Sequence, residues 1–374
     1  MKKIPYGRQT VGLREGLAAF RATTGASITQ GPHIRALEDK ICELVEAKHA
    51  VAVTSGTAAL HLAALVAKVS QVPETVIPGL TFAATASSVV LAGGSPSLTD
   101  IDPMTWNIDL SKVAATAQSI ISVDFAGLPS GITERITHKN VQVIEDCAHS
   151  LGARTPSGPV GGSGSTLMTC FSFHPVKAVT SGEGGIITTN DDQLATELRE
   201  LRSHGIQREN FRLGWEYDIE SIGLNYRLTD IQAAIAVAQL ARLHKFIDIR
   251  NEIAERYRDL LRDDPVGLPP KASPGYLHAY HLFPILLRDG KQRDAVYQYL
   301  HDRGIFVQVH YKALHQLSVF RGLPRHSPSL RETEDITSRI LSLPIFPTLR
   351  KRSQDYVVEC LRGALLHETR AVSK

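Results

Sequence analysis

The feature that most constrains the fold is a series of short apolar runs that alternate with longer helix-like stretches between residue 30 and about residue 190. Each run is continuously apolar rather than apolar at every second position. This is typical of strands buried on both faces of a mostly parallel sheet. The predicted strands are Ala50–Val53, Thr75–Pro78, Ile120–Asp124, Val141–Glu145, Leu167–Ser172 and Gly185–Thr189. The stretches between them, such as Thr57–Lys68, predict covering helices and therefore an α/β fold.

The pattern changes near residue 230, where the apolar residues take up a helical period. A segment rich in Pro and Gly over residues 265–275 then indicates a domain junction. Around and beyond it, the sequence predicts helices over 228–262 and 292–303 and strands over 281–287 and 306–310. We therefore predict a large α/β domain over residues 1–250 and a smaller α+β domain over residues 251–374.

Bulk properties exclude several classes of protein. The net charge of +3, from 41 basic and 38 acidic residues, is too small to indicate a nucleic-acid partner. The first residues contain no apolar segment typical of a signal peptide, and no run of about 18 apolar residues could span a membrane. The four cysteines show no Cys-x-x-Cys spacing, so we expect reduced thiols and no metal site. We predict a cytoplasmic protein.

Three polar features follow predicted strands. Asp146 ends one strand, Lys177 follows another, and the turn Ser55-Gly56-Thr57 joins a third to a helix. The carboxyl ends of strands in an α/β sheet are where ligands bind. An acid, a lysine and a helix N-terminus are what a pyridoxal phosphate (PLP) site requires. The lysine forms a Schiff base, the acid pairs with the ring nitrogen, and the backbone amides hold the phosphate.

Each of these features also has an ordinary interpretation. Most lysines are solvated at the surface, which is the alternative for Lys177. Asp146 and the Ser-Gly-Thr turn are both suited to capping helices. His149 and Phe82 would be ordinary core side chains if no cofactor lay beside them. The residues taken one by one leave both interpretations open.

Taken together, the motifs resemble the DegT/DnrJ/StrS family of PLP-dependent nucleotide-sugar aminotransferases. The resemblance implies the aspartate aminotransferase-like fold (fold type I), with a large, mostly parallel sheet domain and a smaller α+β C-terminal domain. The matching segments occur in the family order and are Ile28–Pro32, Ser55–Leu60, Pro78–Ala86, Glu145–His149, Phe171–Gly185, Arg202–Gly205 and Gly223–Arg227.

The resemblance also implies a role for each site residue. Lys177 would be the catalytic Schiff-base lysine, Asp146 the partner of the ring nitrogen, His149 a contact to the cofactor's oxygen, and Phe82 the stacking ring. The phosphate would be held by Ser55, Gly56, Thr57 and Ser172. Asn225 would reach the cofactor phosphate of the neighbouring subunit, which implies a homodimer with shared active sites. Leu224 departs from the polar residue that relatives often carry there.

Three further segments resemble one branch of the family, the transaminases of pseudaminic acid biosynthesis. They are Ile4–Tyr6, Ser122–Gly127 and Gln308–Lys312. This branch uses L-glutamate to aminate a UDP-linked 4-keto sugar, forming UDP-4-amino-4,6-dideoxy-N-acetyl-β-L-altrosamine for cell-surface polysaccharide or flagellin glycosylation. Candidates for substrate contacts are Tyr6, Arg227, His310 and Tyr311, for which packing roles remain an alternative.

Other functions stay open at this stage. A dTDP- or GDP-linked keto sugar could replace the UDP-linked one. A sugar 3-dehydratase of this family would carry histidine at the position of Lys177, which argues against that activity. A protein that keeps the fold without catalysis would not need both Lys177 and Asp146.

Overall fold

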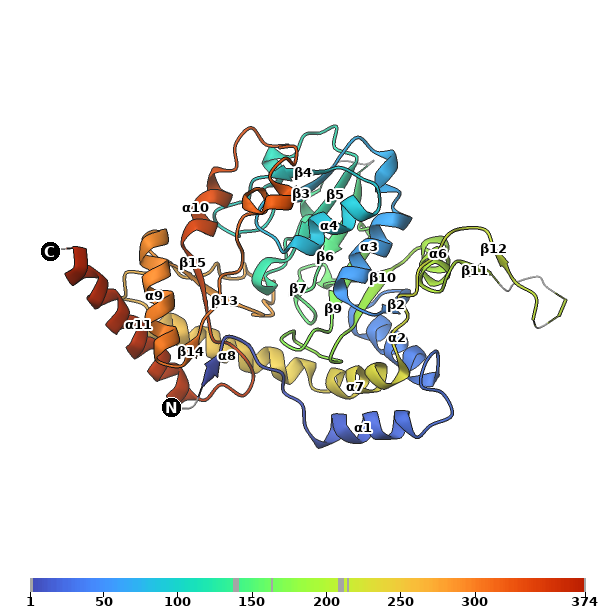
Figure 1. Ribbon diagram of the computed structural model, residues 1–374, viewed down its shortest axis with the longest axis horizontal. Coiled ribbons are helices and arrows are strands. Elements are labelled where there is room, and N and C mark those ends of the chain that lie inside the picture. Colours follow the sequence, from blue (N-terminus) through green and yellow to red (C-terminus); the bar gives the residue numbers. More distant parts are fainter. Residues whose placement is uncertain (1–2, 137–140, 163, 208–211, 214, 373–374) are drawn as a thin grey trace.

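The computed structural model describes residues 3–136, 141–162, 164–207, 212–213 and 215–372. Its centre is a seven-stranded sheet with the strand order β2-β10-β9-β6-β5-β3-β4 (Figure 1). The strands are β2 (His49–Val53), β3 (Thr75–Pro78), β4 (Pro96–Thr99), β5 (Ser119–Val123), β6 (Gln142–Asp146), β9 (Met168–Ser172) and β10 (Gly185–Thr189). Each of the six predicted apolar runs therefore forms a strand of this sheet.

The sheet is mostly parallel, as predicted. Only β10 runs against its two neighbours, β2 and β9, while the other adjacent pairs are parallel. The sequence pattern missed β4, an edge strand that starts at Pro96. Proline is tolerated at such a position because the edge of a sheet does not need every backbone N–H.

Helices cover both faces of the sheet. Val51 and Val53 of β2 pack in a core with α3 (Gly56–Val66), α4 (Ala83–Leu91) and α6 (Asp192–Arg202). Ala50 and Ala52 instead pack in a core with α2 (Pro32–Val45), α7 (Asp230–Leu240) and α8 (Leu243–Leu260). The alternation follows from the two-residue period of a strand. Both faces of β2 are therefore apolar, which is why its sequence shows no polar alternation.

A further core lies in the C-terminal part of the chain. Its elements are β13 (Phe283–Leu286), α9 (Gly290–Asp302), β14 (Ile305–Phe306), β15 (Ile340–Leu343) and α11 (Lys351–Val372). Helix α10 (Arg331–Arg339) instead places Ile336 in a separate cluster with Phe125. The predicted strand over 306–310 is wrong in extent, because β14 ends at Phe306 and Gln308 makes only an isolated bridge to Ser342. The N-terminal strand β1 (Ile4–Pro5) pairs in parallel with β14, which carries the adjoining Tyr6 to this part of the molecule.

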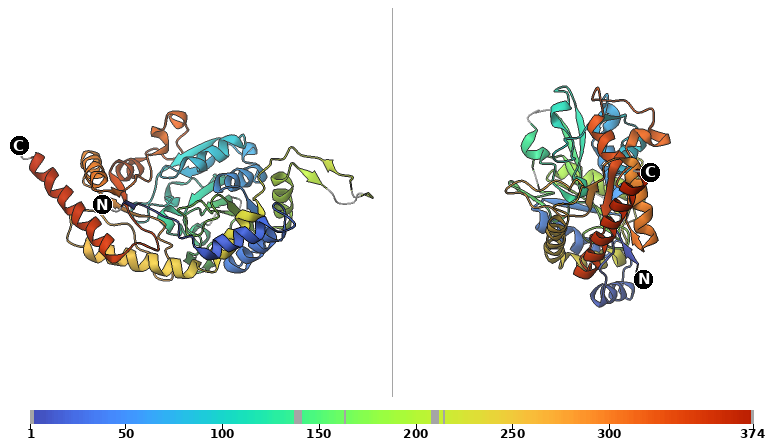
Figure 2. Two further views of the ribbon diagram at one scale, coloured as in Figure 1. Left: turned by 60° about the horizontal axis from the view of Figure 1, so that its bottom comes forward. Right: turned by 90° about the vertical axis from the view of Figure 1, so that its left-hand side faces the viewer.

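The helix predicted over 228–262 is two helices, α7 and α8, separated by Ala241 and Arg242. Neither glycine nor proline marks this break, so the sequence pattern could not reveal it. Helix α8 runs from the large sheet towards α11 (Figure 2) and contributes Ile247 to one core and Ile253 to the other. The predicted boundary between residues 250 and 251 falls inside this helix and stays a prediction.

The remaining elements are peripheral. Helix α1 (Leu13–Thr23) packs on α7. The short elements are α5 (Ile132–Arg135), β7 (Arg154–Thr155), β8 (Gly158–Pro159), β11 (Ile206–Gln207) and β12 (Asp218–Ile219). The β11–β12 hairpin extends away from the body of the molecule (Figure 1). Among the described helices, none combines the length and the apolar character needed to cross a bilayer.

Candidate active site

A cavity of about 760 Å³ opens where β2, β6 and β9 end. These strands point the same way, because β10 is antiparallel to both β2 and β9 while β9 is parallel to β6. The turns after them therefore meet at one edge of the sheet. The predicted site residues that line this cavity are Tyr6, Ser55, Gly56, Thr57, Phe82, Asp146, His149, Ser172, Lys177, His310 and Tyr311.

Lys177 lies in the turn that follows β9. Its backbone N–H donates to the carbonyl of His174 at 2.9 Å, which closes the turn, and its side chain is half-buried. Burial lowers the pKa of Lys177 to about 8, although the nearby Asp146 carboxylate acts in the opposite direction. Desolvation destabilises the charged ammonium form more than the carboxylate restores it. Much of Lys177 is therefore an unprotonated, nucleophilic amine near pH 8.

Asp146 ends β6 and is only 6% exposed. Its Oδ2 accepts a hydrogen bond from the hydroxyl of Thr85 at 2.7 Å, and its Oδ1 accepts one from the backbone N–H of Ala148 at 3.2 Å. Burial raises the pKa of Asp146, whereas these two hydrogen bonds and the charge of Lys177 oppose that rise. The carboxylate is held in place at the wall of the cavity by groups that favour its charged form.

The N-terminus of α3 provides an anion site on the same cavity. Ser55 caps the helix, because its Oγ accepts from the backbone N–H of Ala58 at 3.1 Å. The N–H groups of Gly56 and Thr57, the first residues of the helix, have no intrahelical acceptor. A Cβ on Gly56 would lie 2.8 Å from the Cβ of Ser172, so glycine is required for this close approach. The arrangement suits a phosphate group.

Aromatic side chains form another part of the wall. Phe82 is 55% exposed, although it is large and apolar, and its ring centroid lies 5.5 Å from that of Tyr311. The Tyr311 hydroxyl lies 3.1 Å from Nε2 of His149, whose ring packs 4.3 Å from that of His281. Burial lowers the pKa of His149 well below its usual value, so this imidazole is neutral.

The sequence analysis did not identify Thr81, Thr85 or His281 as residues at or beside this site. Thr81 and Thr85 stand in the Pro78–Ala86 segment, and their spacing of one helical turn is a signal that could have linked them to Asp146. His281 lines the cavity and packs against His149, but it comes from a distant segment whose apolar pattern predicted only a strand. No local signal in the sequence identifies His281.

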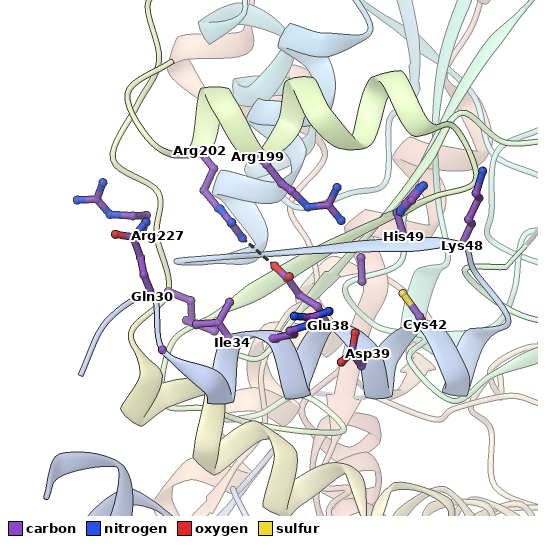
Figure 3. Close-up of a pocket in the computed structure, with 14 residues that line it drawn as sticks. Gln30, Ile34, Glu38, Asp39, Cys42, Lys48, His49, Arg199, Arg202 and Arg227 are labelled. Carbon is purple, nitrogen blue, oxygen red and sulfur yellow. Dashed lines mark hydrogen bonds and ion pairs between the residues drawn. The ribbon is translucent and has the colours of Figure 1, made fainter. Parts of the chain in front are cut away.

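The structure places two predicted site residues elsewhere. Asn225 is exposed at the surface, and Arg227 lines a second pocket of about 430 Å³ between α2, α6 and β2. Figure 3 shows Arg199 and Arg202 reaching from α6 into this pocket, with Glu38 opposite them on α2.

The ion pair in this second pocket has a structural explanation. Arg202 donates to Glu38 Oε1 at 2.8 Å and to the carbonyl of Ala52 at 3.0 Å, and Glu38 Oε1 accepts from the N–H of Ala52 at 2.9 Å. The pair therefore satisfies the N–H and the carbonyl of Ala52 on the edge strand β2. Within a single chain, Arg227 belongs with this sheet edge and not with Lys177.

Several known structures with the same architecture are aminotransferases. Over 97% of this chain and 99% of the other, the structure matches Helicobacter pylori PseC, an aminotransferase involved in the biosynthesis of pseudoaminic acid, with 28% identity and a TM-score of 0.88. A DegT DnrJ EryC1 StrS aminotransferase from Brucella abortus is 30% identical, with a TM-score of 0.84 and coverage of 94% and 95%. The structure also matches Spr1654 from Streptococcus pneumoniae, solved in a PMP form, over 100% of both chains with 24% identity and a TM-score of 0.90.

These matches confirm the predicted fold type I architecture. The model of the DegT/DnrJ/EryC1/StrS aminotransferase family matches residues 14–362, which is nearly the whole chain. This chain is a member of the DegT/DnrJ/EryC1/StrS aminotransferase family.

Proposed function

We propose that this enzyme uses PLP to transfer the amino group of L-glutamate to the C4 ketone of a UDP-linked 4-keto-6-deoxy-N-acetylhexosamine. The product would be UDP-4-amino-4,6-dideoxy-N-acetyl-β-L-altrosamine. The observation that carries the proposal is that Lys177, Asp146 and the N-terminus of α3 line one cavity. The similarity to an aminotransferase of pseudoaminic acid biosynthesis supports the choice of sugar.

The residues present fit PLP. The open amides of α3 beside Ser172 offer donors for a phosphate, and glycine at position 56 leaves the backbone accessible. Asp146 offers a buried carboxylate for a protonated ring nitrogen. The exposed ring of Phe82 offers an apolar surface for stacking. His149 has a buried Nδ1 without a hydrogen-bond partner, which a polar group of the cofactor could satisfy.

The chain's own groups would perform the proton chemistry. When bound, PLP supplies an electrophilic carbonyl carbon and an electron-withdrawing ring. Lys177 would hold the cofactor covalently until the amino donor displaces it, and the freed neutral amine would then move a proton from the α-carbon of the donor to the carbonyl-derived carbon of the cofactor. Asp146 would keep the ring nitrogen protonated. Tyr6 and His310, whose ring centroids lie 5.0 Å apart, would contact the sugar, together with Tyr311.

The proposal is tested with the purified protein, L-glutamate and a panel of UDP-, dTDP- and GDP-linked 4-keto sugars. We expect amination of the UDP-linked substrate and a borohydride-reduced PLP adduct that maps to Lys177. Lys177→Ala should lose both the adduct and turnover, since none of the other described residues that line the cavity is a lysine. Faster turnover of a dTDP- or GDP-linked sugar would overturn the substrate assignment. An adduct on a different lysine would overturn the site.

A further inference from the structure

A chain of buried hydroxyl groups leads to the carboxylate of Asp146. The hydroxyls of Thr81 and Thr85 lie 2.7 Å apart, and Thr85 donates to Asp146 Oδ2 at 2.7 Å. Thr81 and Thr85 are 1% and 0% exposed, and Asp146 is 6% exposed. Solvent therefore cannot replace these hydrogen bonds, and each group depends on its neighbour in the chain.

The number of hydroxyl protons determines which group donates in each hydrogen bond between these side chains. An ionised carboxylate only accepts hydrogen bonds, so the single hydroxyl proton of Thr85 is committed to Asp146. Thr85 must then accept from Thr81, whose proton is committed in turn. Every link presents a positive hydrogen end towards Asp146. The arrangement favours the charged carboxylate over the neutral acid.

The same bonds also fix the orientation of the carboxylate. Thr85 holds Oδ2 from α4, while the backbone N–H of Ala148 holds Oδ1 from the segment after β6. Because these two hydrogen bonds come from different elements, the carboxylate of Asp146 has little freedom to rotate. Asp146 still lines the cavity, so a lone pair remains available to a ligand there.

We propose that Thr85, supported by Thr81, is a positioning residue that holds Asp146 charged and oriented towards the ring nitrogen of the cofactor. The inference rests on the proposed use of PLP. Thr85 itself touches neither substrate nor cofactor in this account, and it acts only through Asp146. The contribution of Thr85 to cofactor binding and to kcat should therefore depend on the presence of the ring nitrogen.

The test compares Thr85→Val, which keeps the shape but removes the hydroxyl, with Thr85→Ser, which keeps the hydroxyl. Ser88→Ala is the matched control, because Ser88 is a fully buried hydroxyl on the same helix that bonds the carbonyl of Thr85 instead of Asp146. The apo form of each variant is titrated with PLP and with 1-deaza-PLP, in which carbon replaces the ring nitrogen. Steady-state kinetics with the amino donor follow.

A hydrogen bond to a charged group predicts a loss of about tenfold to a hundredfold. Thr85→Val should weaken PLP binding and lower kcat within that range, while KM for the donor changes by less than about threefold. Its affinity for 1-deaza-PLP should match that of the wild type. Thr85→Ser and Ser88→Ala should stay within about threefold of wild type in every measurement, as expected for changes that keep the bond to Asp146.

Two results would overturn the proposal. One is that Thr85→Val loses affinity for PLP and for 1-deaza-PLP equally, and the other is that Thr85→Val has wild-type kinetics. Should Thr85→Val fail to fold, Thr81→Val removes the donor one link further away. Losing a neutral hydrogen bond there predicts a kcat reduction of about two- to tenfold, and no reduction would count against the proposal. Failure of the wild type to bind PLP would instead reject the proposed function, which separates the two outcomes.

Discussion

At the scale of single residues, the charge of Asp146 is the property with the clearest consequence. Asp146→Asn keeps the size of the side chain but cannot balance a protonated ring nitrogen. We expect the variant to fold and to lose about a hundredfold or more in kcat, roughly 2.7 kcal/mol at about 1.36 kcal/mol per decade. Circular dichroism would verify folding, and steady-state kinetics would give the loss. A kcat within twofold of wild type would remove Asp146 from the cofactor site.

Lys177 gives a prediction about pH. Its pKa of about 8 means that the neutral amine is scarce below pH 8 and predominates above it. The rate at which apo protein captures PLP covalently should therefore rise about tenfold per pH unit well below pH 8 and level off above about pH 9. Stopped-flow absorbance at a series of pH values would measure this. A profile centred near pH 10.4, where free lysine titrates, would contradict the desolvation that lowers the pKa of Lys177.

At the scale of elements, the junction of β2 with α3 has a steric requirement. A Cβ at position 56 would come within 2.8 Å of the Cβ of Ser172, on the neighbouring strand β9. Gly56→Ala should displace the amides of α3 from the phosphate and weaken PLP binding by about tenfold or more, since a lost charge-assisted hydrogen bond costs about 1.5–3 kcal/mol.

The matched control for Gly56→Ala is Gly16→Ala, also at a helical glycine. There a Cβ would meet no atom within 4 Å, and the change should leave PLP binding intact. Titration of the apo variants with PLP would compare them. Equal affinities for Gly56→Ala and wild type would mean that the α3 N-terminus does not hold the phosphate.

Elements also explain what the sequence could reveal. Strands buried on both faces leave a continuous apolar run, so Asp146, at the end of one run, and Lys177, in the segment after another, are recognisable as candidate ligands. Strand β4 contains Pro and polar residues, so it lacks the apolar run by which the other strands are predicted. The break between α7 and α8 contains neither Gly nor Pro, so the sequence does not indicate where one helix ends and the next begins. His281 reaches the cavity only through packing of the C-terminal part against the sheet, which no local pattern encodes.

At the scale of the whole molecule, the cavity of one chain offers few cationic side chains for its proposed substrates. Among the described residues that line it, Lys177 is the only lysine or arginine, although a nucleotide sugar and glutamate are both anionic. Asn225 is exposed outside this cavity, and the β11–β12 hairpin extends away from the body with Trp215 and Ile219 exposed. These features agree with the expectation, drawn from the family resemblance, that a second copy of the chain contributes to each site, and we propose this arrangement.

Mixed dimers give the decisive test of this arrangement. One chain carries Lys177→Ala, and the other carries Asn225→Trp to block the phosphate site of its partner. Each homodimer should be inactive. If sites are shared, the mixed dimer holds one site with an intact lysine and an intact Asn225 from the other chain, while both defects fall together in the second site.

Mixing the two variants should therefore restore activity to about half that of a wild-type two-fold dimer, per mixed dimer formed. Native mass spectrometry would measure how many mixed dimers are present, and the activity would be divided by that number. Two wild-type preparations taken through the same exchange control for losses during mixing. Mixed dimers that form in quantity but show no recovery would assign Asn225 to its own chain's site or to no site, because only sharing across the interface can reunite the two intact residues.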